Sequence, residues 1–165
     1  MIYVTLGTQA CDFSRCMKMV EELVIQVNIK DRVVAQTGYT SYHPACVECF
    51  DFVPENQYQK LLEDADVVIS HAGTGALFSS IKKGKKVIAV ARLALYGEMV
   101  NDHQTEIVRK LADEGYILDG TYDLKAAWKN VSTFEPRKND FHCEIGRRIE
   151  QLLADWGVQK RKNEN

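Results

Sequence analysis

The sequence predicts an α/β fold in which a Rossmann-like parallel sheet has helices on both faces. Short runs rich in valine and isoleucine are apolar throughout, as the strands of a buried parallel sheet are. These runs alternate with segments whose apolar residues recur every three or four positions, the spacing of amphipathic helices. The chain has 165 residues, 45% of them hydrophobic and 27% charged, which is enough for one domain with a full core.

The first half of the chain alternates strands and helices. Residues 2–6 form a β-rich run that Gly7 ends, and strands follow over residues 33–35 and 47–53. A helix begins near Asp12, and Pro54 opens a second one. Their apolar stripes are Phe13, Met17, Val20, Val24 and Val27 in the first helix, and Tyr58, Leu61, Leu62 and Ala65 in the second.

The second half continues the alternation. Strands are predicted over residues 66–70, 87–91 and 116–118. A helix over residues 76–83 ends at Gly84, and Asn101 or Asp102 can cap a helix that ends at Gly115. A last apolar stripe runs from Phe141 to Trp156, and we expect one domain over residues 1–157 and a basic polar tail over residues 158–165.

Charge and hydropathy exclude several partners. The 21 basic and 23 acidic side chains give a formal charge of −2, so no global field attracts a polyanion and nucleic acid is not the expected partner. No apolar run approaches the roughly 20 residues that span a bilayer, and we expect a cytoplasmic protein. The odd number of five cysteines fits reduced thiols. Cys46 and Cys49 form a single Cys-x-x-Cys pattern, which leaves a redox pair or half a zinc site open.

Ligands of such sheets bind beyond the carboxyl ends of the strands, where glycine-rich loops occur in this chain. The loop His71, Ala72, Gly73, Thr74, Gly75 lies between a predicted strand and a predicted helix. Its glycines let a ligand approach the backbone, and the free N–H groups of the helix favour an anion. Thr74 adds a hydroxyl that can also cap the helix. Gly7 and Thr8 offer a second such loop, and the two together suit a diphosphate.

Three other phosphate or metal motifs are excluded. Phe78 stands where a dinucleotide fingerprint has its third glycine, and Gly84 has neither the spacing nor the ending of a Walker A loop. Asp64 and Asp66 resemble the Asp-x-Asp pattern of metal-dependent sugar transferases, but they lie near the amino end of a predicted strand and read as solvated surface. We therefore expect no metal and no cofactor.

Polar side chains crowd the loop before the fourth predicted helix. They are Glu98, Asn101, Asp102, His103 and Gln104. This set of donors, acceptors and one imidazole suits the recognition of sugar hydroxyls. Helix capping explains Asn101 or Asp102 alone, and compensation of the helix dipole explains Glu98 alone.

These motifs carry a family resemblance. Ser70–Gly75, Gly84–Ile88, the block from Glu98 to Gln104 and Glu114–Tyr116 resemble the C-terminal, donor-binding half of the GT-B glycosyltransferases of family 28. The start Val4–Thr8 and Gln36–Gly38 extend the resemblance. The chain is most similar to two groups of half-length proteins, bacterial exopolysaccharide or capsule β-1,4-galactosyltransferase subunits and the catalytic subunit of the eukaryotic dolichol-pathway UDP-N-acetylglucosamine transferase.

The resemblance implies a single GT-B half domain and an enzyme. A sugar, galactose or N-acetylglucosamine, would pass from a UDP-sugar donor substrate to a polyprenyl-diphosphate-linked saccharide, with inversion and without metal, in exopolysaccharide or capsule biosynthesis. It also implies a membrane-anchored partner subunit on the acceptor side. The chain would then be peripheral at the inner face of the cytoplasmic membrane through that partner.

The resemblance also assigns roles to residues. Gly7, Thr8 and the loop His71–Gly75 would hold the diphosphate, Gln36 and Gly38 would lie near the uridine, and Asn101–Gln104 would meet the donor sugar. Glu98 is a candidate general base, although the base can instead belong to the partner. Ser79 stands where many relatives have a ribose-binding glutamate, and a hydroxyl binds ribose more weakly than a carboxylate does.

Other functions remain open on the sequence alone. A nucleotide-sugar-binding regulatory module would use the same phosphate loop without turnover, and a flavodoxin-like interaction domain would not bind UDP. The C-terminal stripe, with Arg147, Arg148 and the basic tail, is either core packing or a docking helix for a partner or for anionic lipid.

Overall fold

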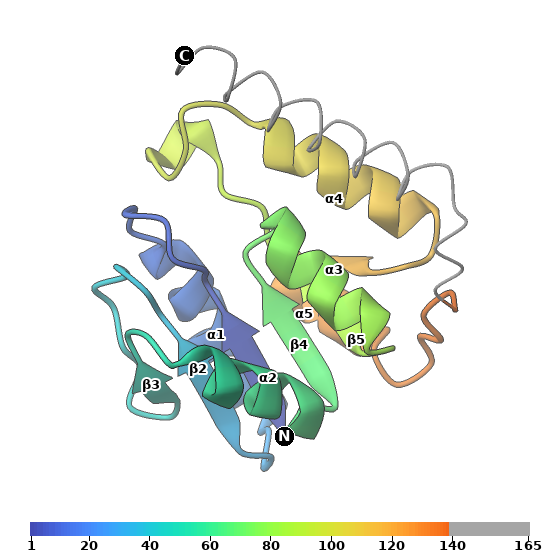
Figure 1. Cartoon of the computed structure of the whole chain (residues 1–165), viewed down its shortest axis with the longest axis horizontal. Helices are drawn as coiled ribbons and strands as arrows, with labels where there is room; N and C mark the ends of the chain where they lie inside the picture. The colour runs from blue at the N-terminus through green and yellow to red at the C-terminus, as the bar shows by residue number, and fades with distance from the viewer. Residues whose placement is uncertain (139–165) are drawn as a thin grey trace, which may run out of the picture.

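The computed structural model describes residues 1–138, in which six strands form one parallel sheet (Figure 1). The strands are β1 (Ile2–Thr5), β2 (Val33–Gln36), β3 (Glu48–Phe50), β4 (Val67–Ser70), β5 (Lys86–Ala89) and β6 (Leu118–Asp119). Their order is β3-β2-β1-β4-β5-β6, so the direction of winding reverses between β1 and β4. Open α/β sheets bind their ligands at this switch point. The predicted Rossmann-like sheet is confirmed.

Helices cover both faces of the sheet, as predicted (Figure 1). The helices are α1 (Ser14–Val27), α2 (Glu55–Asp64), α3 (Thr74–Lys82), α4 (His103–Asp113) and α5 (Leu124–Lys129). Alternate side chains of β1 point to opposite faces of the sheet and show which helices cover each face. Ile2 and Val4 pack with α1 and α5, while Tyr3 packs with α2, α3 and α4. Every residue of β1, β2 and β4 is buried, which explains their continuous apolar sequences.

Several elements differ from the prediction, and β3 at Glu48–Phe50 is shorter than the strand predicted over residues 47–53. Leu23, not Val27, completes the buried face of α1, and Val27 is 45% exposed. The last strand, β6, pairs with β5 only at Leu118 and Asp119, and Tyr116 and Ile117 lie in the core just before it. Helix α5 was not predicted, although Asp123 caps it by accepting a hydrogen bond from the Ala126 N–H at 2.9 Å. The helix expected over residues 141–156, and the boundary at residue 157, lie outside the described residues.

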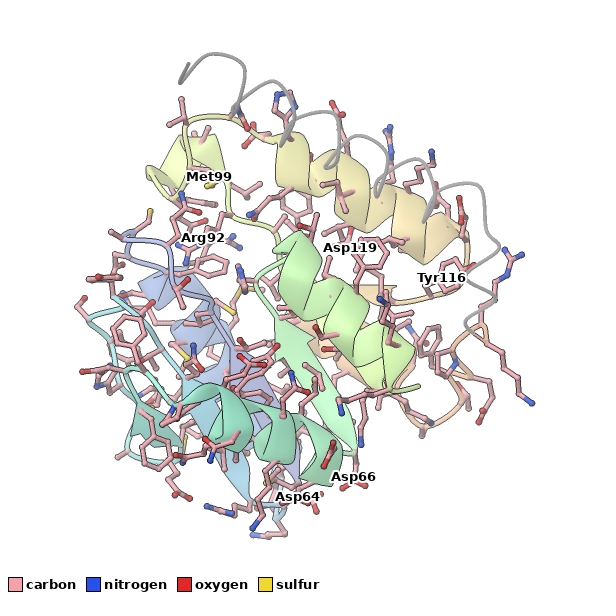
Figure 2. The ribbon with its side chains drawn as sticks, in the orientation of Figure 1. Asp64, Asp66, Arg92, Met99, Tyr116 and Asp119 are labelled. Atoms are coloured by element: carbon pink, nitrogen blue, oxygen red, sulfur yellow. The ribbon has the colours of Figure 1, made fainter. Side chains whose placement is uncertain are left out.

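The strand register brings three loops to one edge. Thr5 pairs with Gln36 on one side and with Ser70 on the other, so β1, β2 and β4 end level with one another. Asp64 and Asp66 lie at the opposite end of the molecule (Figure 2). Asp66 there accepts a hydrogen bond from the amino terminus, which agrees with its assignment to the surface. Within residues 1–138, no helix is both long enough and apolar enough to cross a bilayer.

Candidate functional site

The loops after β1 and β4 meet across the imidazole of His71. Two hydrogen bonds fix this residue, because its backbone N–H and its Nδ1 both lie 3.0 Å from the Thr5 carbonyl oxygen. A Cβ atom built on Gly7 or on Gly73 would overlap the imidazole. Both positions therefore require glycine, and the two glycine loops are neighbours, as the hypothesis of a shared diphosphate site needs.

His71 is neutral at physiological pH, because burial lowers its pKa from 6.5 to about 4. A carbonyl oxygen only accepts hydrogen bonds, so the proton of the neutral ring is on Nδ1. Nε2 is then unprotonated, and it is the ring atom nearest to the Cβ positions of Gly7 and Gly73. The lone pair of this nitrogen therefore faces the two glycine loops.

A third loop, after β2, packs against the first. Gly38 has a φ of +59°, and a Cβ there would lie 2.6 Å from the Gly7 carbonyl oxygen. Both the backbone conformation and the close approach demand glycine. The pairing of the Gly7 and Gly73 loops was predicted, whereas the packing of Gly38 against Gly7 was not.

We expect Gly38→Ala to lower the free energy of unfolding by about 2 kcal/mol, because alanine is strained at positive φ and also meets the Gly7 carbonyl. Gly84→Ala is the matched control, because Gly84 has a φ of +65° but open space around its Cβ position. That variant should lose only about 1 kcal/mol. Urea unfolding measures both, and equal losses would mean that the contact with Gly7 carries no strain.

The amino end of α3 presents free amides beside His71. The first intrahelical bond is donated by Leu77 to the Gly73 carbonyl at 3.0 Å, so the N–H groups of Thr74, Gly75 and Ala76 have no acceptor within the helix. Gly73 is the N-cap, and no side chain caps the helix. The helix thus begins two residues earlier than predicted, and Thr74 does not cap it. Free amides and the helix dipole together favour an anion.

Side chains of the β5–α4 loop hold the loop together. Three consecutive N–H groups, those of Arg92, Leu93 and Ala94, donate to side-chain oxygens of Gln104, Glu98 and Asp102 at 2.9, 2.9 and 2.7 Å. Asp102 therefore occupies the N-cap position of α4 without capping it. Three of the side chains predicted to recognise sugar hydroxyls therefore bond to the backbone of their own loop.

The groups of this loop that remain available are fewer than predicted. Asn101 accepts the His103 N–H at 3.3 Å through Oδ1, and both residues are exposed. Gln104 uses its Oε1 on Arg92, which leaves its amide N–H₂ as donor. Contact of these three residues with a sugar stays a prediction.

Glu98 is part of a buried ion pair. It is 4% exposed, and both of its oxygens accept hydrogen bonds from Arg15, at 2.9 and 3.0 Å. The Leu93 N–H also donates to one of these two oxygens, Oε2. A base must accept a proton from an acceptor hydroxyl, and this carboxylate is already held by a cation and an amide. The geometry therefore argues against the prediction that Glu98 is the general base.

Two arginines at this edge, Arg15 and Arg92, were not among the predicted residues. Arg92 is 1% exposed, and its guanidinium donates to the carbonyls of Leu6, Cys11 and Asp12 at 3.0 to 3.3 Å. It also stacks on Phe13 at 4.5 Å. Figure 2 shows Arg92 and Met99 at the end of the molecule away from Asp64 and Asp66. Arg92 is the only charged residue in the otherwise apolar run from Val87 to Leu95, and this was the sequence signal that could have indicated a buried arginine.

The remaining predicted residues lie on several different elements. Thr8 is exposed, and Ser79 is partly exposed on α3. Gln36 is 6% exposed, and its Oε1 has no hydrogen-bond partner in the part of the chain that the structure describes. Cys46 and Cys49 are free thiols. Among residues 1–138, no three His, Cys, Asp or Glu side chains are grouped so that they could hold a metal ion.

Comparison with known proteins identifies the family. The model of the glycosyltransferase family 28 C-terminal domain matches residues 1–138. The chain belongs to this family. A human relative, UDP-N-acetylglucosamine transferase subunit ALG13, is 30% identical over 123 residues, which cover 70% of this chain and 10% of the relative. This family 28 chain spans about a tenth of the length of the human and mouse relatives that it matches.

Solved structures confirm the fold of the family 28 domain. The NMR solution structure of ALG13 superposes with a TM-score of 0.59 at 21% identity, covering 92% of this chain and 94% of that one. The calicheamicin glycosyltransferase CalG4 superposes with a TM-score of 0.54 at 17% identity, covering 99% of this chain and 40% of that one. The chain thus has the architecture of one half of a GT-B glycosyltransferase.

Proposed function

We propose that this chain is the donor-binding half of a UDP-sugar-dependent hexosyltransferase. One observation carries the proposal: the glycine loops after β1 and β4 converge on neutral His71, beside the free amides of α3, at the switch point of the sheet. A diphosphate needs close backbone approach, several N–H donors and a positive dipole, and this edge supplies all three. Membership of family 28 supports the same donor.

The loops divide the donor among them. Gly7, Thr8 and the loop from His71 to Gly75 bind the diphosphate. Gln36 and Gly38 lie on the uridine side, while Asn101–Gln104 lie on the sugar side. As the bond between the sugar and the phosphate breaks, negative charge grows on the leaving UDP. The amides of Thr74, Gly75 and Ala76 stabilise that charge without a metal.

Binding of the diphosphate is coupled to protonation of His71 in this proposal. A diphosphate next to Nε2 places negative charge against the imidazole and raises its pKa from about 4. Binding therefore favours uptake of a proton at Nε2, which can then donate to a phosphate oxygen. Thr5 holds the ring in the orientation that this step needs.

A second subunit completes the enzyme in this proposal. Glu98 is held by Arg15, so we assign the general base to the acceptor-side partner. The curated relatives are named as subunits of a transferase, which supports a heteromeric enzyme. The partner is membrane-anchored, the acceptor is a polyprenyl-diphosphate-linked saccharide, and the chain sits at the inner face of the cytoplasmic membrane through the partner. An exopolysaccharide or capsule product is the corresponding proposal for the pathway.

The names of those relatives make N-acetylglucosamine the first sugar to test, with galactose as the alternative. Calorimetry with the full chain should show one site for UDP and for one of the two UDP-sugars, undiminished by a metal chelator. No binding of any uridine nucleotide would contradict the proposal and favour a plain interaction domain. Binding without transfer, when the acceptor-side subunit and acceptor are present, would favour a regulatory module.

A further inference from the structure

Arg15 joins helix α1 to the loop that carries Asn101–Gln104. All five of its guanidinium N–H groups have an acceptor. Nε and Nη2 donate to the two Glu98 oxygens, and Nη2 also donates to the Ala91 carbonyl at 2.7 Å. Nη1 donates to the Thr121 carbonyl at 2.7 Å and contacts the Met19 sulfur at 3.6 Å. Arg15 has no donor left for a ligand, so it can affect a ligand only through its partners.

Glu98 links Arg15 to the backbone of the loop. Its side chain is 5% exposed, and it accepts the N–H of Leu93, at the start of the loop, while it pairs with Arg15. A desolvated pair with this geometry is directional, and removal of either partner leaves a buried charge without compensation. The Tyr96 ring lies 5.2 Å from the Arg15 guanidinium carbon and packs the same loop onto it.

Other bonds hold the loop to itself or to the segment between β1 and α1. In that segment, the Cys11 thiol donates to the Glu98 carbonyl at 2.7 Å, and Gln9 Nε2 donates to the Met99 sulfur at 3.2 Å. Gln104 and Asp102 bond to Arg92 and Ala94, so these contacts begin and end within residues 92–104. The Arg92 side chain ties the first residue of the loop to the segment after β1. Arg15 differs from these contacts because it lies within α1 and links the Glu98 carboxylate both to that helix and to the Thr121 carbonyl after β6.

We infer that Arg15, acting through Glu98, is a positioning residue for recognition of the donor sugar. It sets where Asn101, His103 and Gln104 stand relative to the glycine loops, and it leaves the diphosphate site itself untouched. This inference rests on the proposed function, because it assigns the sugar to the β5–α4 loop.

The test compares the affinities of UDP and of the UDP-sugar that the wild-type chain binds, by calorimetry on the full chain. Arg15→Gln should weaken the UDP-sugar about tenfold and leave UDP within about twofold, because small displacements of positioning groups cost that much or more. Arg32→Gln is the matched control. Arg32 pairs with Glu48 at 2.6 Å, but both side chains are exposed, so its loss should change neither affinity.

Circular dichroism establishes that each variant is folded. If Arg15→Gln does not fold, Arg15→Lys decides, because an ammonium keeps the charge but cannot make the five bonds. Arg15→Lys should shift the ratio of the two affinities in the same direction. An unchanged ratio, or equal weakening of both ligands, in a folded variant would overturn the inference while UDP binding upholds the proposed function. Failure of the wild-type chain to bind UDP would overturn the proposed function itself.

Discussion

Gly75→Asp is expected to weaken UDP binding about 100-fold or more while the domain stays folded. The Cβ position of Gly75 has no atom within 4 Å, so the new side chain meets no steric barrier. A carboxylate near a helix N-terminus is favourable for folding by about 0.5 kcal/mol. The same carboxylate repels a diphosphate bound to the α3 amides, and two like charges about 4 Å apart near a protein surface cost several kcal/mol. Stability and binding therefore change in opposite directions.

Gly75→Asn separates charge from bulk, because it has nearly the shape of the aspartate variant without its charge. It should bind UDP within a few-fold of wild type, as measured by calorimetry, and thermal unfolding should show both variants folded. Wild-type UDP affinity in folded Gly75→Asp would place the diphosphate elsewhere and would remove the central observation behind the proposed function.

Acidification is expected to destabilise the protein through His71. Its pKa is about 4 in the folded state, below the ordinary value of 6.5, so the unfolded chain binds the proton first as the pH falls. The contribution of His71 to stability is thus complete above about pH 6.5 and is lost as the pH falls toward about 4. Between about pH 7.5 and about pH 5 the loss amounts to about 2 kcal/mol.

Urea unfolding of wild type, His71→Gln and His43→Gln at these two pH values tests this expectation. His71→Gln should lack the 2 kcal/mol loss, because glutamine does not titrate. His43→Gln controls for the loss of a histidine elsewhere in the chain, because His43 lies on another loop, where its Nε2 is 3.0 Å from the Thr40 carbonyl. The same pH dependence in all three proteins would show that the His71 imidazole is not held as the structure places it.

Strands β1, β2 and β4 were predictable because every residue in them is buried, and burial on both faces leaves a mostly apolar sequence as its signature. Helix α5 was missed because its six residues are too few for a periodic stripe, although Asp123 offered a capping signal. The glycine loops were predictable for a local reason, since glycine between a strand and a helix indicates close approach of a ligand. That His71 separates Gly7 from Gly73 depends on chain segments more than 60 residues apart.

The roles of the β5–α4 loop could be predicted only in part. Sequence shows which side chains can donate or accept, but it does not show which of them the chain itself will use. Glu98 illustrates this, because its partner Arg15 is 83 residues away. The same limit applies to Asp102, whose Oδ1 binds the Ala94 N–H instead of capping the helix that it precedes.

The side chains of Gln104, Glu98 and Asp102 accept hydrogen bonds from the N–H groups of residues 92–94, and these bonds also affect the thermodynamics of binding the proposed nucleotide-sugar donor. A segment tied down in this way has given up its conformational freedom during folding, before any substrate arrives. Little further entropy is then lost on association, so a modest number of hydroxyl contacts yields useful affinity. We therefore expect this segment to bind the sugar without a conformational change and with a small heat-capacity change.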